Sequence, residues 1–400
     1  MPQALEQRDA LRARREAIGE LFPKQVVLLA AGGVQLRNIP SVPHPFRPSS
    51  HFVHLFGMQP AGSIGVIAEG ESLLFVPRPP EDDVLWHGAG TSAAERREQT
   101  GVDFVHDREK LDDHLQRFDA GKILSVPTLD PLTNQELEAL IGRMPSAYGQ
   151  DSVLMDALVD SRLVNDEYAI SELRAAAAVT VEAARRAMEI TRPGRNEREL
   201  RAKAIKAFVA NGAVEAFSSI ITTEAEVLHR TPSDNELEAG ELVLCDIGAE
   251  LPSGYSSDLT RVWPVSGTFS PRQKELYEVV LEAQLAALAL AKPGVRFRDL
   301  HLIACRSLTD GLVQLGILSG DPEELVSRGA HAIFFPHGLG HLIGLDVHDM
   351  EDLGDRAGYQ DSRIRSEAFG LSFLRLDRDL QEGMAVTFEP GCYIIPALLD

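Results

Sequence analysis

Two aspartates twelve positions apart could hold a cation. Asp246 follows the apolar residues 243–245 in ELVLCDIGAE, and Asp258 precedes a strand-like run in YSSDLTRVWPV. A charged carboxylate in a buried strand is costly unless it is paired or bound to metal. A hairpin through residues 252–254 would bring the two carboxylates together, and they repel unless a cation lies between them. The pair predicts an oxygen-rich divalent-metal site. The alternatives are a strand-end turn at Asp246 and an ion pair between Asp258 and Arg261.

Three histidines follow in FFPHGLGHLIGLDVHDMED. His337, His341 and His348 lie within twelve residues, and the glycines at 338 and 340 argue against an HExxH zinc helix. A single histidine in an apolar segment is usually a core residue, but three in one glycine-rich segment favour a site. One imidazole can bind metal while the others bind substrate or transfer protons, since imidazole titrates near neutral pH.

Two further residues are weaker candidates by themselves. Glu389 in GMAVTFEPGCYII is predicted to end an apolar strand before a Pro-Gly turn, and after the aspartates and histidines it offers another oxygen ligand. His229 in EAEVLHRTPSDN lies in a polar, loop-like stretch, where an isolated histidine is most often a surface residue.

The overall composition limits the class of protein. The chain has 400 residues, enough for two or three domains, and its 44% apolar and 25% charged residues are typical of a soluble globular protein. The net charge of −21 argues against nucleic-acid binding. No apolar run resembles a signal peptide or a membrane span, so we expect no membrane partner. The three dispersed cysteines form neither a disulfide framework nor a CxxC zinc site, which favours a cytoplasmic protein.

The order of the elements predicts two domains. Residues 1–157 read as a small α/β domain, with a charged helix near 8–20 and a hairpin in SIGVIAEGESLLFVPRPP. From residue 166, a helix with an N-cap at 165 or 166 is followed by a second helix after the break at 193–194. Strands and two long helices near 271–291 and 297–316 then complete a domain spanning 158–400.

These segments, in this order, resemble the pita-bread metallopeptidases: methionine aminopeptidase, aminopeptidase P and prolidase. The motif PHGLGHxxGxDVHD is specific, and PFRPSSHFVHLFG and SLLFVPRPPEDDVLWHG resemble the amino-terminal domain of prolidases. The resemblance covers nearly the whole chain. It implies an α+β protein in which a small α/β amino-terminal domain precedes a pita-bread catalytic domain.

The resemblance also implies a site with two divalent metals. Its ligands here are Asp246, Asp258, His341 and Glu389. Asp246 would chelate one metal, Asp258 would bridge, and His341 would complete the second site. The resemblance makes Glu389, His337 and His348 catalytic, and places the two histidines and His229 at the substrate. A metal-bridging hydroxide would attack the bond before proline, and a metal with a nearby histidine would stabilise the oxyanion.

One ligand of the family pattern is not present in the printed sequence. The family's last glutamate follows an R-I-E-D-like stretch well downstream of FEPG, but residue 400 comes eleven positions after Glu389. SRIRSE at 362–367 precedes Glu389, so Glu367 is not assigned. Either the fifth ligand lies beyond residue 400 or this protein holds its metals with an incomplete set. We expect the first, because an FEPG strand without its partner would expose a sheet edge.

The resemblance favours an Xaa-Pro dipeptidase, with aminopeptidase P as the alternative. A dipeptidase must recognise the free carboxylate after proline, and a guanidinium suits that pairing. LRLDRDLQEGM matches a prolidase stretch and places Arg375 in this role, and the long insert after VHD is also typical of dipeptidases. The other interpretation of Arg375 is a surface ion pair with Asp377 or Asp379.

A second alternative is a metal-free binding protein with the peptidase fold, although such proteins lose the carboxylates that this chain keeps. Oxygen ligands with one histidine favour Mn²⁺, with Zn²⁺ or Co²⁺ possible. By resemblance, Trp86 would reach a neighbour's site, so we expect a homodimer acting on a proline-containing peptide.

Overall fold

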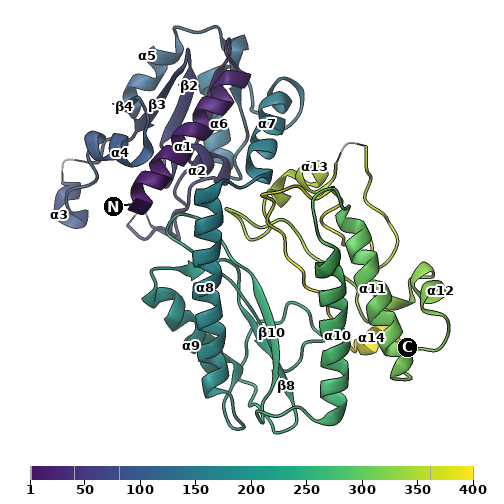
Figure 1. The fold of residues 1–400 in the computed structure, drawn as a ribbon. Coiled ribbons are helices and arrows are strands. Elements are labelled where there is room, and N and C mark those ends of the chain that lie inside the picture. Colours follow the sequence, from purple (N-terminus) through teal and green to yellow (C-terminus); the bar gives the residue numbers. More distant parts are fainter. Residues whose placement is uncertain (1, 40, 81, 361, 400) are drawn as a thin grey trace. The chain divides into compact units, whose positions relative to one another are not determined.

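The computed structural model describes every residue except 1, 40, 81, 361 and 400. The chain forms two compact units, Met1–Arg162 and Leu163–Asp400 (Figure 1). Residue 158, where the sequence predicts the boundary, lies inside the helix α7 (Ser152–Leu163), five residues before its end.

The first unit is built on a mixed five-stranded sheet in the order β4-β3-β2-β1-β5. Its strands are β1 (Val26–Ala30), β2 (Ile64–Ala68), β3 (Glu71–Val76), β4 (Phe104–Asp107) and β5 (Ile123–Ser125). The predicted hairpin is β2–β3, whose turn residues Glu69 and Gly70 have φ of 53° and 81°. Positive φ at both positions gives the backbone twist that a two-residue hairpin needs.

Helices pack around this sheet. They are α1 (Pro2–Leu21), α2 (Ser50–Phe56), α3 (Asp83–His87), α4 (Ala93–Thr100), α5 (Leu111–Leu115), α6 (Pro131–Ile141) and α7, with short 3₁₀ turns at Arg108–Lys110, Ala120–Lys122 and Gly149–Asp151. Alternate residues of β1, such as Val26, Leu28 and Ala30, join one core with Leu137 and Ile141 of α6. The other face is covered too, because Val27 and Leu29 are also buried.

The second unit contains small antiparallel sheets, which contact the first of its two helical hairpins. Its strands are β6 (Val214–Glu215), β7 (Ile220–Thr222), β8 (Leu242–Ile247), β9 (Ala249–Glu250) and β10 (Leu259–Pro264), with the order β10-β8-β7 and a separate β6-β9 pair. Its longer helices are α8 (Glu167–Ile190), α9 (Glu197–Ala210), α10 (Pro271–Leu290) and α11 (Phe297–Gln314). Figure 1 shows α8 beside β8 and β10, and α10 beside α11.

Local signals account for the ends of these helices. The Asp166 side chain caps α8 by accepting from the Ala169 amide, and Asn196 and Glu199 form a reciprocal capping box on α9. The predicted ranges 271–291 and 297–316 agree with α10 and α11 to within two residues. After α11 the described residues form only short helical pieces, which are α12 (Pro322–Ser327), η4 (Ala330–Ile333), η5 (Glu351–Leu353), α13 (Asp355–Gly358) and α14 (Pro396–Leu399). Of the described helices, none is long and apolar enough to cross a membrane.

Candidate metal centre and active site

Strand β8 separates a core face from a polar face. Val243, Cys245 and Ile247 are fully buried in the core that α8 and α9 share with the sheet, so Asp246 points to the opposite face. β10 pairs with β8 antiparallel, with Thr260 opposite Asp246. Asp258, two residues before Thr260, is therefore the diagonal neighbour of Asp246 on the same face. The predicted hairpin forms, with a diagonal rather than a direct pairing of the two aspartates.

A close backbone approach allows this crossing. A Cβ on Gly248 would lie 2.0 Å from the carbonyl oxygen of Ser257, a distance that no side chain can occupy. Glycine at 248 thus lets the end of β8 meet the residues that lead into Asp258.

Asp246 is a half-buried carboxylate with one oxygen atom fully buried. Its Oδ1 has no hydrogen-bond partner among the described residues. Burial and the nearby charge of Asp258 raise the pKa of Asp246 to about 7. A buried acceptor without a donor is the environment in which a cation would be most stabilising.

His341 faces two of the carboxylates. Its Nε2 lies 3.3 Å from Asp258 Oδ2 and 3.7 Å from Glu389 Oε1, and its side chain is only 2% exposed. Its Nδ1 lies 2.9 Å from the carbonyl oxygen of Leu342, and since a carbonyl can only accept, Nδ1 carries a proton. In the neutral ring Nε2 is then an acceptor that faces two other acceptors. Burial alone would lower the pKa of His341, but the Asp258 hydrogen bond and the charge of Glu389 raise it to about 9.

Glu389 does not end a continuous strand, so that prediction is wrong in detail. Residues 385–389 run beside the histidine segment through backbone bonds that include Thr387 N to His341 O at 3.0 Å and Glu389 N to Leu339 O at 2.8 Å. A regular antiparallel ladder would also have the His341 amide donate to the backbone carbonyl of Thr387. Instead, this amide donates to the Thr387 hydroxyl at 3.0 Å. A Cβ on Gly340 would lie 2.1 Å from the carbonyl oxygen of Thr387. Burial is the largest influence that raises the pKa of Glu389, to about 8.

His337 is held by backbone and by a tyrosine. Its Nδ1 lies 2.9 Å from the carbonyl oxygen of Gly338, so Nδ1 carries the proton and Nε2 accepts from the Tyr393 hydroxyl at 3.1 Å. Phe335 packs edge-on against the ring, with 4.8 Å between centroids. Burial lowers the pKa of His337. His337 is therefore a neutral imidazole with a fixed tautomer.

His348 connects the metal-facing residues to Arg375. Its ring stacks on His341 at 4.0 Å between centroids, and its Nδ1 donates to Glu351 Oε2 at 3.0 Å. Arg375 also pairs with Glu351, whereas Asp377 pairs with Arg296. The alternative interpretation, a surface ion pair of Arg375 with Asp377 or Asp379, is thus replaced by a pair with Glu351. Burial would raise the pKa of Glu351, but the His348 hydrogen bond and nearby positive charge lower it.

His229 is the least constrained of the predicted residues. It lies exposed in a turn between β7 and β8. It is near enough for its positive charge to lower the pKa of His337. Glu367, which the sequence did not assign as a ligand, is also exposed.

The residues present fit a divalent metal. Single ligand atoms of Asp258, His341 and Glu389 lie within 4.8 Å of one another, and Asp246 adds its unpaired oxygen across the hairpin. Three or more acceptors sharing a buried space require a proton or a cation, and carboxylates with one imidazole suit a hard or borderline ion. A second group, His341, His348 and Glu351, adjoins the first through the shared His341.

Sequence reasoning missed two residues that shape this site. Glu351 joins His348 to Arg375, and its only signal is its place three residues after His348. Tyr393 bonds His337 from 56 positions away, so no local pattern could reveal it.

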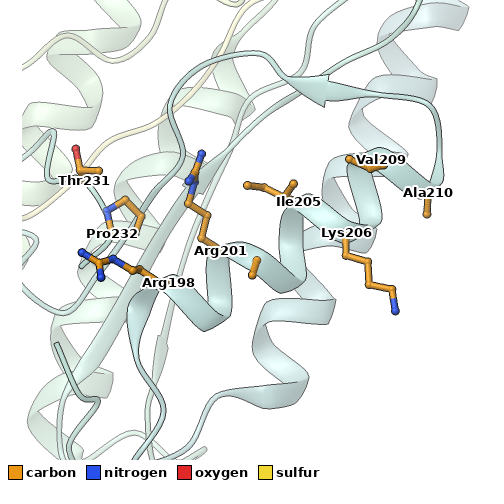
Figure 2. Close-up of a pocket in the computed structure, with 9 residues that line it drawn as sticks. Arg198, Arg201, Ile205, Lys206, Val209, Ala210, Thr231 and Pro232 are labelled. Atoms are coloured by element: carbon orange, nitrogen blue, oxygen red, sulfur yellow. The ribbon is translucent and has the colours of Figure 1, made fainter. Parts of the chain in front are cut away.

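A hollow lies elsewhere on this unit. It is about 850 Å³, runs along α9, and is lined by Arg198, Arg201, Lys206 and apolar neighbours such as Ile205 (Figure 2). None of the residues just described lines it, so this hollow on α9 is separate from the candidate metal centre.

Comparison with known proteins identifies the family of this chain. Residues 171–398 match the model of metallopeptidase family M24, and residues 11–124 match the aminopeptidase P N-terminal domain. Relatives include a probable Xaa-Pro aminopeptidase of Colletotrichum graminicola, 36% identical over 90% of this chain and 76% of that protein. Another, from Fusarium vanettenii, is 34% identical over 88% of this chain and 74% of that protein.

Solved structures agree as well. Aminopeptidase PepP of Pseudomonas aeruginosa has a TM-score of 0.82 and 30% identity, covering 97% of this chain and 87% of that one. Aminopeptidase P of Escherichia coli with the inhibitor Pro-Leu has a TM-score of 0.81 and 28% identity, covering 97% and 88%. These matches confirm the predicted α+β class, with an amino-terminal domain followed by a pita-bread catalytic domain.

Proposed function

Since this chain belongs to metallopeptidase family M24 and carries an aminopeptidase P N-terminal domain, we propose that it is an Xaa-Pro aminopeptidase. It would release the first residue of peptides whose second residue is proline. The relatives named above carry this activity in their names, which favours the aminopeptidase alternative over the dipeptidase interpretation.

The observation that supports this choice is the pairing of Arg375 with Glu351. A dipeptidase needs a guanidinium free to bind the carboxylate that follows proline. Here the guanidinium is already neutralised by Glu351, which is in turn held by His348. A longer peptide needs no such cation, because its proline is followed by a neutral amide.

Two divalent ions would be held by four residues: Asp246, Asp258, His341 and Glu389. When bound, such ions lower the pKa of water and polarise the scissile carbonyl. The oxygen-rich set with one imidazole favours Mn²⁺ over Zn²⁺ or Co²⁺.

The residues around this centre have separate roles in catalysis. The Leu342 carbonyl fixes the tautomer of His341, so that Nε2 faces the carboxylates. Glu389, whose burial raises its affinity for a proton, can take the proton lost by the attacking water. His348, held through Nδ1 by Glu351, would lie beside the bound substrate. His337 keeps the Tyr393 hydroxyl in one orientation, and His229 lies at the substrate edge.

The protein is also proposed to be a cytoplasmic homodimer. Its cysteines are free, and Cys245 and Cys305 are fully buried thiols, as in proteins of reducing compartments. Trp86 in α3 is 75% exposed, which suits a side chain that serves a neighbouring subunit. Sedimentation of wild type and Trp86→Ala, with the activity of each, tests the dimer and the role of Trp86.

The deciding experiment is cleavage of Ala-Pro-Ala and Ala-Pro by the purified protein with added Mn²⁺. Release of alanine from the tripeptide supports the aminopeptidase. Cleavage of Ala-Pro alone would instead establish the dipeptidase. A protein that binds no metal and cleaves neither peptide would be the metal-free binding protein.

A further inference from the structure

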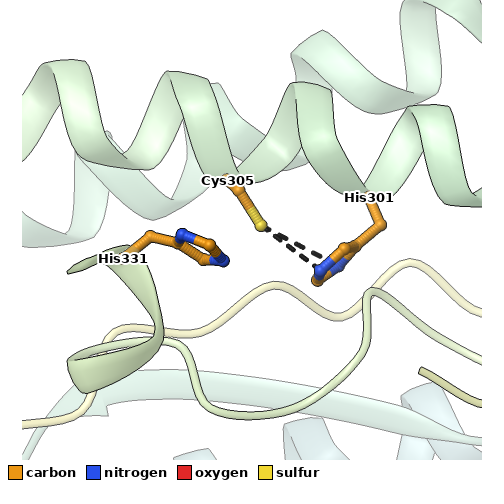
Figure 3. Close-up of side chains that lie close together, drawn as sticks. All are labelled: His301, Cys305 and His331. Atoms are coloured by element: carbon orange, nitrogen blue, oxygen red, sulfur yellow. Dashed lines mark hydrogen bonds between the residues drawn. The ribbon is translucent and has the colours of Figure 1, made fainter. Parts of the chain in front are cut away.

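A buried group of nitrogen and sulfur ligands lies apart from the proposed catalytic residues. His301 and Cys305 are one turn apart on α11, and His331 lies on η4 (Figure 3). The three residues are 0%, 0% and 2% exposed. One ligand atom from each lies within 4.8 Å of the other two. Figure 3 shows the three side chains converging between the helix and the short 3₁₀ turn.

Packing and hydrogen bonding explain only part of this group. Cys305 Sγ lies 3.4 Å from His301 Nε2, a contact that a thiol–imidazole hydrogen bond would satisfy. His331 has no such explanation, because both of its ring nitrogens are buried without a hydrogen-bond partner in the described part of the chain. A buried imidazole normally bonds at least one nitrogen, so His331 lacks a partner that the protein itself does not supply.

We propose that His301, Cys305 and His331 form a second metal site, which takes a thiophilic closed-shell cation, Zn²⁺ or Cu⁺. Thiolate and imidazole ligands select these ions, whereas the carboxylate-rich catalytic set suits harder ones. Binding would break the S–H bond, release that proton to solvent and form a sulfur–metal bond, with no change in oxidation state. Three ligands suit a trigonal Cu⁺, and Zn²⁺ would add a fourth, exogenous ligand.

The spacing fits this chemistry. With Zn–S near 2.3 Å and Zn–N of about 2.0–2.1 Å, tetrahedral geometry separates sulfur from nitrogen by about 3.6 Å and two nitrogens by about 3.3 Å. The observed 3.4 Å between Cys305 and His301 already matches. His331 must close by no more than about 1.5 Å, since all pairs lie within 4.8 Å.

The site would support the catalytic segment. His331 lies six residues before His337, and Phe335 between them packs against both His301 (5.5 Å between ring centroids) and His337 (4.8 Å). An ion that joins α11 to η4 would hold Phe335, and through it the His337 ring, in one position. This inference does not depend on which peptide the enzyme cleaves.

Cobalt provides a direct test, because Co²⁺ bound to a thiolate gives a near-ultraviolet sulfur-to-metal charge-transfer band that oxygen and nitrogen ligands do not. We expect Co²⁺-loaded wild type to show this band. Cys305→Ser should lose it, and the matched control Cys392→Ser, which alters a partly buried thiol outside the group, should keep it. A missing band in wild type, or a band that survives in Cys305→Ser, would overturn the proposal.

Metal analysis distinguishes the two ions, and a second variant that should fold normally separates loss of the site from misfolding. His331→Leu breaks no hydrogen bond, so the variant should fold, and it should bind one equivalent less of Zn²⁺ or Cu⁺ than wild type. Anaerobic titration with each ion alone identifies the tighter one. The melting temperature of wild type should rise with that ion beyond the rise in His331→Leu, whose catalytic metals are intact. Equal stoichiometry in the two proteins would refute the site.

Discussion

Asp246→Asn should make the metal-free protein more stable while it removes activity. In the wild type, burial and the charge of Asp258 raise the pKa of Asp246 from 3.8 to about 7. A carboxylate with a raised pKa binds more protons in the folded state, so it costs stability as pH rises above its unfolded pKa. Asparagine keeps the shape and removes this cost. The substitution should therefore act in opposite directions on stability and on function.

The size of the effect follows from the shift. About three pKa units correspond to about 4 kcal/mol at pH 8, and the same linkage gives less than half of that at pH 5. Because Asp246 interacts with Asp258 and His341, whose charges readjust, we expect a gain of about 2–4 kcal/mol at pH 8. For a unit of this size that is a rise in Tm of roughly 2–4 °C for each kcal/mol.

The assay is thermal unfolding of chelator-dialysed protein at pH 8 and pH 5, with and without Mn²⁺. The control is Asp234→Asn, whose side chain is 80% exposed and should leave Tm unchanged. Mn²⁺ should stabilise the wild type and the control but not Asp246→Asn. A metal-free Asp246→Asn that is less stable than wild type at pH 8, or that gains equally at pH 5, would refute the reasoning.

Four further outcomes are expected. Arg375→Ala should change KM for Ala-Pro-Ala less than twofold, measured by initial rates; a much larger rise for Ala-Pro than for the tripeptide would restore the dipeptidase interpretation. Tyr393→Phe removes the donor to His337 Nε2. It should lower kcat about 10–100-fold with little change in KM, as expected for a group that supports proton transfer. An unchanged kcat would show that Tyr393 has no role in the mechanism. Gly340→Ala forces a Cβ against the carbonyl of Thr387 and should destabilise the protein by at least about 1–3 kcal/mol in urea unfolding. The control Gly90→Ala, in open space and without a positive φ, should leave stability almost unchanged, and an equal effect of the two substitutions would contradict this. Removal of the metal by a chelator should abolish activity. The rise in Tm on adding Mn²⁺ should be larger at pH 8 than at pH 6, because cations compete with protons for these ligands. An equal rise at both pH values would contradict this.

Much of the fold was predictable because its signals are local. Asp166 and Asn196 mark the starts of α8 and α9, and Pro271 and Phe297 begin the two later long helices where the periodicity places them. The hairpin carrying Asp246 was predictable too, since alternation and a turn between two runs are features of neighbouring residues.

The detail of the site was less predictable. Glu389 was expected at the end of a strand, but the Thr387 side chain takes the backbone bond that would have continued the ladder. Side-chain capture of a backbone donor depends on how closely two segments approach, which a propensity pattern does not contain.

The sequence by itself determined which residue types could bind a cation and in what order they occur along the chain. Only the tertiary structure decided which partners they meet: Glu351 for Arg375, Tyr393 for His337, and His331 for the pair on α11. The three dispersed cysteines indicated no thiolate site, yet one of them lies between two buried imidazoles. The physical reason is that burial and charge compensation arise from contacts between residues distant in sequence, and these contacts set the pKa and metal affinity of each group.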